Sequence, residues 1–297
     1  MKIYDCFMFY DETMLLEIRL NILNKFVDKF IITEASYLHN GHHKKLNFDI
    51  KNFQEFKHKI EYIVVNDHPA SILELSDKDN ESEKSRKKII NSLKRENFQR
   101  EELAKGLLNI DNEDLIIISD VDEIPNLESL KFNEINNEII IFKQKMFYYK
   151  FNLFYPDLIW MGSRISKKKY LQSPQWLRNI KTKNYPWYRF DTLFSKKKYK
   201  DINFIENGGW HFSNVKKPDE IDFKMRNFAH HLEYEESGLD ADKIEKNIKE
   251  KKVFYNHFAD MSDSNKLNHS ANLINIDKKK LPKYLYSNLD KYSKWLD

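Results

Sequence analysis

The first half of the chain alternates between short apolar runs and helical patterns. Apolar runs suited to buried strands occur at 3–9, 29–34, 60–65 and 115–119. Apolar residues recur at helical spacing over 12–24 and again over 85–108, while the polar stretch 67–84 is expected to be a loop. Alternation of this kind predicts a mostly parallel sheet covered by helices, an α/β fold.

After residue 120 the pattern changes. Strand-like runs at 138–142, 144–151 and 157–165 follow one another with little helix between them, so we expect some of them to pair antiparallel. From Pro218 onward the chain has a helical pattern rich in lysine, which ends in the segment 281–296. We therefore expect one main domain over 1–260 and a helical C-terminal appendage over 261–297.

Composition narrows the class of protein. The 297 residues are 41% hydrophobic and 32% charged, as in globular proteins with a sizeable core. A net charge of +4 is small for a nucleic-acid binder, so no nucleic-acid partner is expected. The single cysteine, Cys6, excludes an intramolecular disulfide and fits a reducing compartment.

No apolar stretch approaches the about 20 residues that a membrane span needs, so we expect a cytoplasmic protein without a transmembrane segment. Runs of lysine occur at 167–169, 196–198 and 278–280. The simplest interpretation is that each run lies on a solvent-exposed surface. Together they could also attract an anionic surface, which would place the protein peripherally at the inner membrane face.

Candidate chemistry centres on one acidic motif. Asp-x-Asp occurs three times, and only Asp120/Asp122 directly follows a buried strand. Ligands of open α/β sheets bind outside the carboxyl ends of strands, and residues i and i+2 of an extended chain point to the same side. With Glu123, three acids lie within four residues, and Mg²⁺ or Mn²⁺ would relieve their repulsion. The alternative is an acidic helix-capping turn, with Pro125 near the first helical position.

The sequence around these acids resembles glycosyltransferase family 17, the β-1,4-mannosyl-glycoprotein β-1,4-N-acetylglucosaminyltransferase-like enzymes. The most specific string is Ser-Asp-Val-Asp-Glu-Ile-Pro at 119–125. The blocks that carry the resemblance appear in the same order across most of the chain, at 5–9, 16–20, 27–35, 40–42, 45–48, 95–100, 114–125, 208–213 and 228–230.

The resemblance implies a GT-A-like (Rossmann-like) mixed sheet flanked by helices and a metal-dependent, inverting glycosyltransferase. Asp120 and Asp122 would hold Mn²⁺ or Mg²⁺ against the diphosphate of a UDP-sugar donor, with UDP-GlcNAc the first to consider. The acceptor would be a glycan hydroxyl. A metal suits this chemistry because negative charge builds up on the leaving nucleotide. Since no membrane anchor is expected, surface polysaccharide or glycoconjugate synthesis is the expected setting.

Further residues are candidates for the same site. Inverting transfer needs a general base, for which Glu206, Asp191 and Glu123 are candidates, although each could be an ordinary surface carboxylate. His211 and His230 could supply a later metal ligand, or could be structural histidines.

Donor contacts have three candidates in the first half of the chain. Arg95 and Arg100 could clamp phosphate, but arginines on a helix surface often pair with nearby acids instead. Glu34, at the end of its expected strand, could contact the base or ribose, or cap a loop.

Two other functions stay open at this stage. A metal-dependent nucleotidyltransferase or phosphotransferase could use the same acids. A non-catalytic glycan-binding module could use Trp160, Trp176, Trp187 and Trp210 as a sugar platform.

Overall fold

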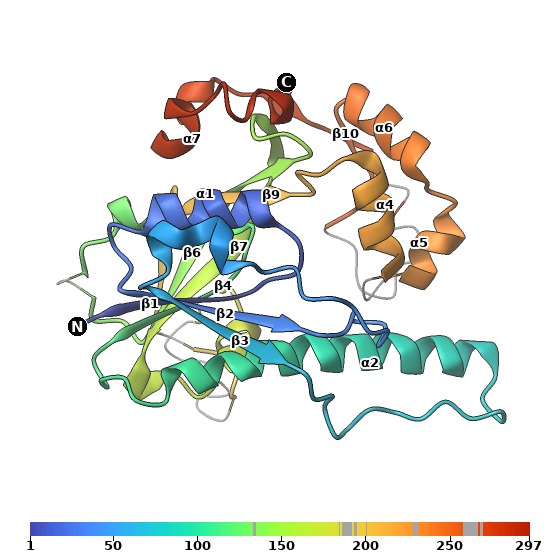
Figure 1. The fold of residues 1–297 in the computed structure, drawn as a ribbon, viewed down its shortest axis with the longest axis horizontal. Helices are drawn as coiled ribbons and strands as arrows, with labels where there is room; N and C mark the ends of the chain where they lie inside the picture. Colours follow the sequence, from blue (N-terminus) through green and yellow to red (C-terminus); the bar gives the residue numbers. More distant parts are fainter. Residues whose placement is uncertain are drawn as a thin grey trace.

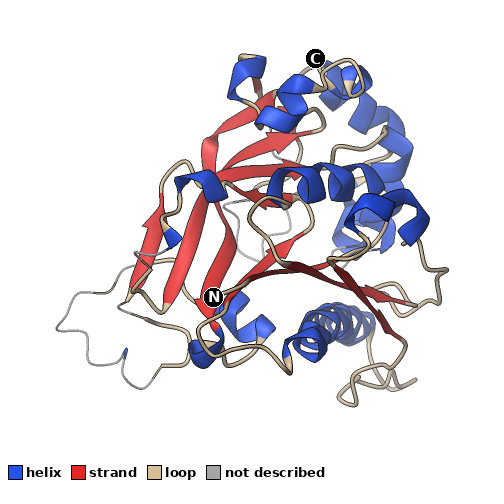
Figure 2. Cartoon of the chain, turned by 60° about the vertical axis from the view of Figure 1, so that its left-hand side comes forward, coloured by secondary structure: helices blue, strands red, loops and turns tan. Residues whose placement is uncertain are grey.

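A mixed β-sheet runs through the molecule, and helices cover both of its faces (Figures 1 and 2). The computed structural model describes residues 1–132, 135–183, 185, 192, 195–199, 201–227, 231–257, 267 and 270–297. In these residues ten strands form the main sheet, in the order β3-β2-β1-β4-β7-β6-β9-β5, with β8 paired to β6 and β12 to β7. This arrangement confirms the α/β, Rossmann-like fold class.

The first four strands are parallel. They are β1 (Ile3–Met8), β2 (Lys29–Ala35), β3 (Ile60–Val65) and β4 (Leu115–Asp120), and β1 lies between β2 and β4. Strands buried on both faces read as continuous apolar runs, which is why β1, β2 and β4 are recognisable in the sequence. The edge strand β3 is only partly buried, and its β-branched residues make it recognisable. Because the strands are parallel, the carboxyl ends of β1, β2 and β4 meet at one edge.

The rest of the sheet is mixed. Strand β7 (Leu153–Lys167) pairs antiparallel with β4 and with β6 (Ile139–Tyr148), while β9 (Gly209–Ser213) runs parallel to β6 and antiparallel to β5 (Glu123–Pro125). The short strand β8 (Ile202–Ile205) also runs parallel to β6. The two runs expected at 138–142 and 144–151 form the single strand β6, because a register shift between Ile141 and Lys143 lets the pairing continue.

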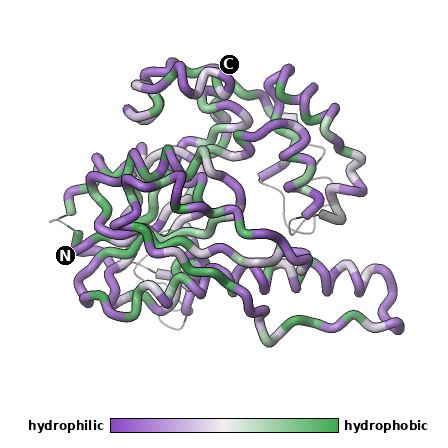
Figure 3. Tube along the Cα trace, in the orientation of Figure 1, coloured by the Kyte–Doolittle hydropathy of each residue, from purple (hydrophilic) through white to green (hydrophobic). Residues whose placement is uncertain are grey.

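Helices α1 (Thr13–Leu23) and α2 (Glu81–Glu101) lie on opposite sides of the sheet (Figure 1). The expected loop at 67–84 is wrong in its last residues, because α2 begins at Glu81. Asn80 accepts a hydrogen bond from the backbone N–H of Glu83, whose carboxylate accepts one from Asn80, a capping box. Hydrophobic residues concentrate on the central strands and hydrophilic residues on much of α2 (Figure 3).

The remaining helices lie mostly in the second half of the chain. They are α3 (Pro174–Asn179), α4 (Pro218–Asn227), α5 (His231–Ser237), α6 (Ala241–Lys249) and α7 (Lys283–Ser287). Short 3₁₀ helices occur at η1 (Ile50–Phe56), η2 (Glu102–Leu107), η3 (Leu127–Ser129), η5 (Lys168–Tyr170), η7 (Lys278–Lys280) and η8 (Ser293–Trp295).

The C-terminal segment contains short strands as well as helices. Strand β11 (Ala271–Asn272) pairs with β10 (Lys252–Val253), and β12 (Ile274–Asn275) joins the main sheet beside β7. Helix α7 then packs against α1. The expected boundary at residue 260 stays a prediction, since 258–266 lie outside the described residues.

A buried ion pair joins α1 to the sheet. The guanidinium group of Arg19 donates to both carboxylate oxygens of Asp5 on β1, at 2.8 and 2.6 Å, and both side chains are fully buried. Removing one partner of such a pair leaves an uncompensated buried charge. The resulting loss of stability is much larger than the net stabilisation that the intact pair contributes.

We expect Arg19→Met to destabilise the protein by about 3–5 kcal/mol. The measurement is the midpoint of urea unfolding. Lys249→Met provides the control because Lys249 is 71% exposed in its pair with Glu245, where a change within about 0.5 kcal/mol is expected. Equal midpoints for the two variants would contradict this account of the pair.

Candidate active site

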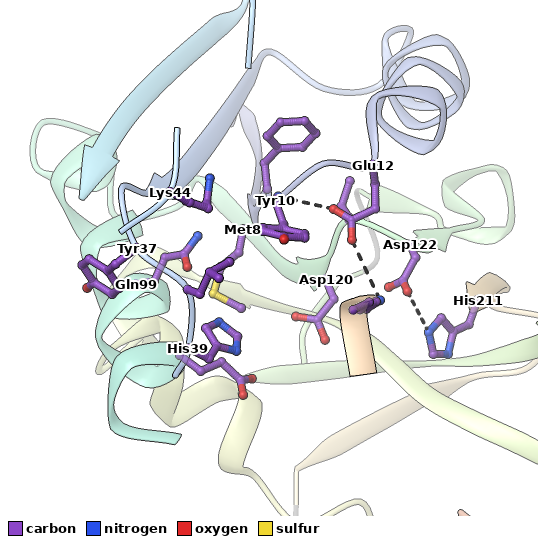
Figure 4. A pocket seen from close by; sticks show the side chains of 15 residues that line it. Met8, Tyr10, Glu12, Tyr37, His39, Lys44, Gln99, Asp120, Asp122 and His211 are labelled. Carbon is purple, nitrogen blue, oxygen red and sulfur yellow. Dashed lines mark hydrogen bonds and ion pairs between the residues drawn. The ribbon is translucent and has the colours of Figure 1, made fainter. Parts of the chain in front are cut away.

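A cavity of about 210 Å³ opens where the carboxyl ends of β1, β2 and β4 meet (Figure 4). Ligands of open α/β sheets bind at this edge. Asp120 and Asp122 lie at one side of the cavity, and His211 from β9 lies beyond Asp122. The other lining residues are Met8, Phe9, Tyr10, Glu12, Tyr37, Leu38, His39, Lys44, Glu96, Gln99, Val121 and Lys224.

The backbone of the acidic turn 120–123 is held by α1 and β9. Besides pairing with Asp5, Arg19 donates through Nη1 to the carbonyl oxygens of Asp120, at 3.2 Å, and Glu123, at 2.5 Å. The N–H of Phe212 donates to the carbonyl of Asp122 at 2.9 Å. Buried backbone carbonyls need such donors, so these contacts fix the path of the turn.

Two arginines hold the side chain of Asp120. Arg178 on α3 donates to Asp120 Oδ2 at 2.9 Å, and Arg100 on α2 donates to Oδ1 at 3.2 Å. Burial alone would raise the pKa of Asp120, but the two guanidinium groups outweigh it and hold the pKa well below its usual range. Asp120 is therefore a carboxylate with charge compensation already in place.

The same Arg178 holds Glu123. It donates to both oxygens of that carboxylate, at 2.8 and 3.0 Å, and Trp160 Nε1 donates at 2.6 Å. The backbone N–H of Asp120 adds a fourth hydrogen bond at 3.1 Å, and the Glu123 side chain is fully buried. Glu123, predicted as a candidate base, is therefore engaged by donors and is not among the lining residues of the cavity.

Asp122 and His211 face each other. His211 Nε2 lies 3.4 Å from Asp122 Oδ2. Burial lowers the pKa of His211, but the nearby carboxylates, Asp122 first and then Glu123 and Asp120, together outweigh it, so the net shift of the pKa is upward. The imidazole also packs against the Trp160 ring, with 4.7 Å between centroids, and its buried Nδ1 has no hydrogen-bond partner in the described part of the chain.

This pair fits part of a divalent metal site. Neither arginine of the cluster contacts Asp122, and Mg²⁺ or Mn²⁺ is commonly held by one or two protein ligands completed by substrate phosphate and water. Asp120 fits less well because both of its oxygens accept from arginine. Among the residues that the structure describes, no group of three or more His, Cys, Asp or Glu side chains forms a metal site.

Comparison with known proteins then decides the family. The sequence model of Glycosyltransferase family 17 matches residues 1–296, essentially the whole chain. The chain belongs to glycosyltransferase family 17. It is therefore an enzyme that uses a sugar donor and an acceptor, which favours glycosyl transfer over the two alternative functions. A search of curated proteins finds no match.

In this family 17 glycosyltransferase, the three predicted donor contacts do not line the cavity, but each contacts a residue that does. Glu34 is fully buried and accepts from the N–H groups of Asn47 and Phe48, at 2.8 and 3.0 Å, while pairing with Lys44. Arg95 donates to the carbonyl of His39 at 3.1 Å. Lys44 and His39 line the cavity, whereas Glu34, Arg95 and Arg100 do not.

The other predicted residues lie elsewhere. The Glu206 side chain is 71% exposed, pairs with Lys143 and is not among the cavity's lining residues. Asp191 and His230 fall outside the described residues. Their roles stay predictions.

Sequence reasoning missed several residues of the site. Arg178 is 58 positions from Asp120, and no local pattern links the two. Lys44 and Lys224 looked like two of many lysines, and Glu12 and Glu96 like ordinary helix acids. Only their position around the cavity, beside the Asp120 motif, separates them from surface residues.

No helix in the described part of the chain is both long and apolar enough to cross a bilayer.

We expect Glu123→Gln to lower stability, because the amide removes the charge opposite Arg178 and cannot accept from every donor around it. The expected cost is about 3 kcal/mol, measured by urea unfolding. Glu206→Gln is the matched control, with a change within about 0.5 kcal/mol. A Glu123→Gln variant of wild-type stability would refute a structural role and return Glu123 to the list of catalytic bases.

Proposed function

We propose that this enzyme moves a sugar from a nucleoside diphosphate donor to a glycan hydroxyl, in a metal-dependent, inverting reaction on a GT-A-like fold. UDP-GlcNAc is the first donor to test. The observation that carries the proposal is the Asp122–His211 pair at the edge of a cavity where three parallel strands end. Cationic and aromatic side chains line the same cavity.

We assign the donor's nucleotide to the cavity itself. Tyr10 and Tyr37 offer aromatic surface for a base. Lys44 and Lys224 carry the positive charge that a diphosphate requires. The cavity, about 210 Å³, is smaller than the roughly 300–1,000 Å³ of typical ligand pockets, so the sugar would extend beyond it.

We assign the two aspartates different tasks. Asp122 and His211 would hold Mn²⁺ or Mg²⁺, which when bound offsets the charge that develops on the leaving diphosphate. Asp120, kept ionised by Arg178 and Arg100, retains acceptor capacity because a carboxylate has about four lone-pair sites. It would orient the donor by accepting from a ribose or sugar hydroxyl.

Inverting transfer also requires a group that removes the proton of the acceptor hydroxyl. Besides the two aspartates, Glu12 and Glu96 are the carboxylates that line the cavity in the described residues. We keep these two, together with Asp191, as candidates for the base. We also propose Trp160, whose ring packs against His211, as a surface on which an acceptor sugar would stack. We further propose that the acceptor belongs to a surface polysaccharide or other glycoconjugate.

The test is thermal unfolding with a panel of nucleotide sugars, each with Mn²⁺ and with EDTA. A ligand at 100 times its dissociation constant stabilises the native state by about 2.7 kcal/mol. We expect one UDP-sugar to raise the melting temperature with Mn²⁺ and to raise it much less with EDTA. Asp122→Asn should abolish the metal-dependent part while the unliganded protein still melts cooperatively.

The control is Asp242→Asn, which changes an acid of another Asp-x-Asp motif, in the first turn of α6. It should respond like the wild type. A cooperative transition that no nucleotide sugar shifts would refute the donor site. An undiminished Mn²⁺ effect in Asp122→Asn would refute the metal assignment alone.

A further inference from the structure

A second cavity lies behind the candidate active site, across strand β9. It measures about 490 Å³ and lies between the end of α1, η3 and the C-terminal segment 279–284. Trp210 lines this cavity, whereas its neighbour His211 lines the first one. Successive residues of a strand point to opposite faces, so the two cavities are back to back across one strand.

The lining of this second cavity, which we call the Trp210 cavity, combines two kinds of group that suit sugars. Aromatic rings can stack on the apolar face of a sugar ring, and carboxamides can both donate to and accept from hydroxyls. The aromatic residues are Phe26, Trp210 and Tyr284, and the carboxamides are Asn21, Asn24 and Asn126.

The charge of the lining is strongly positive. Four lysines, Lys25, Lys279, Lys280 and Lys283, line the Trp210 cavity together with a single acid, Glu128. Glu128 pairs with Lys25 and, at 3.4 Å, with Lys283. Within the described residues, no carboxylate forms an ion pair with Lys279 or Lys280. An anionic ligand would compensate this charge.

The walls of the cavity are fixed by the fold. Trp210 Nε1 donates to the carbonyl of Lys280 at 3.2 Å, which ties β9 to the C-terminal segment. Asp277 accepts from the N–H of Lys279 at 2.9 Å and caps η7. Next to Trp210, Gly209 has a φ of +128°, and a Cβ there would lie 2.2 Å from the carbonyl oxygen of Ile124. A preformed site needs little ordering when a ligand binds.

We propose that the Trp210 cavity binds an acidic segment of the acceptor glycan, one that carries carboxylate or phosphate groups, away from the point of transfer. The inference rests on the glycosyltransferase family and on no assumption about donor or metal. A second binding site for the same glycan would raise the effective concentration of its acceptor end at the active site. A saccharide fits better than a membrane because Trp210 lies in the cavity, partly buried, instead of projecting from the surface.

The experiment is calorimetric titration of the full chain without nucleotide or metal. The probes are an oligogalacturonate, a neutral malto-oligosaccharide of the same length and vesicles containing phosphatidylglycerol. We expect the oligogalacturonate to bind in preference to the other two. Lys279→Glu/Lys280→Glu should weaken this binding at least tenfold, about 1.4 kcal/mol.

The matched control is Lys246→Glu/Lys249→Glu on α6, where the two lysines are 72% and 71% exposed. It makes the same change of net charge and should bind as the wild type does. Trp210→Leu removes the ring and should weaken binding without reducing its salt dependence, provided that the variant still melts cooperatively.

Three results would overturn the proposal. One is absence of oligogalacturonate binding, and another is equal weakening in the control, which would indicate a diffuse charge effect. The third is a preference for vesicles that depends on Lys279 and Lys280, which would identify a lipid-headgroup site. Since nucleotide and metal are absent, failure here leaves the donor test unaffected, and failure of the donor test leaves this one intact.

Discussion

Three arginines hold the acidic turn at residues 120–123, and the site depends on them. Arg19 binds the backbone carbonyls of the turn, Arg178 binds the carboxylates of Asp120 and Glu123, and Arg100 binds Asp120 again. Buried carboxylates are costly unless they are paired and hydrogen-bonded. The arginines supply that compensation from α1, α2 and α3 to the fully buried Glu123 and the partly exposed Asp120, so the turn is charged and fixed in place.

These three arginines give the acids of one short motif different surroundings. Glu123 accepts hydrogen bonds through both carboxylate oxygens and does not line the cavity. The charge of Asp120 is compensated by two arginines, but Asp120 still lines the cavity. Asp122 turns toward His211 instead of toward an arginine. The paired strands β5 and β9 set this arrangement, since Glu123 is opposite His211 in their register. For this reason we propose Asp122 and His211, and not Asp120, as the metal ligands.

The sequence predicted those parts of the molecule whose signals are local. The parallel strands read as apolar runs, and the Asp120 motif followed one of them. The start of α2 was missed although Asn80 and Glu83 form a recognisable capping box. The partners of the acids could not be predicted, because Arg178 and Arg19 are 58 and 101 positions from Asp120. The same holds for Lys44 and Lys224, which only the fold brings to the cavity.

The most direct test of this account is to locate Mn²⁺ by anomalous diffraction in crystals grown with UDP and Mn²⁺. The account predicts an anomalous peak bound by the Asp122 carboxylate and His211 Nε2, with the Arg178–Asp120 ion pair intact. A peak bound by Asp120 with Arg178 displaced, or one remote from His211, would contradict the division of tasks between the two aspartates.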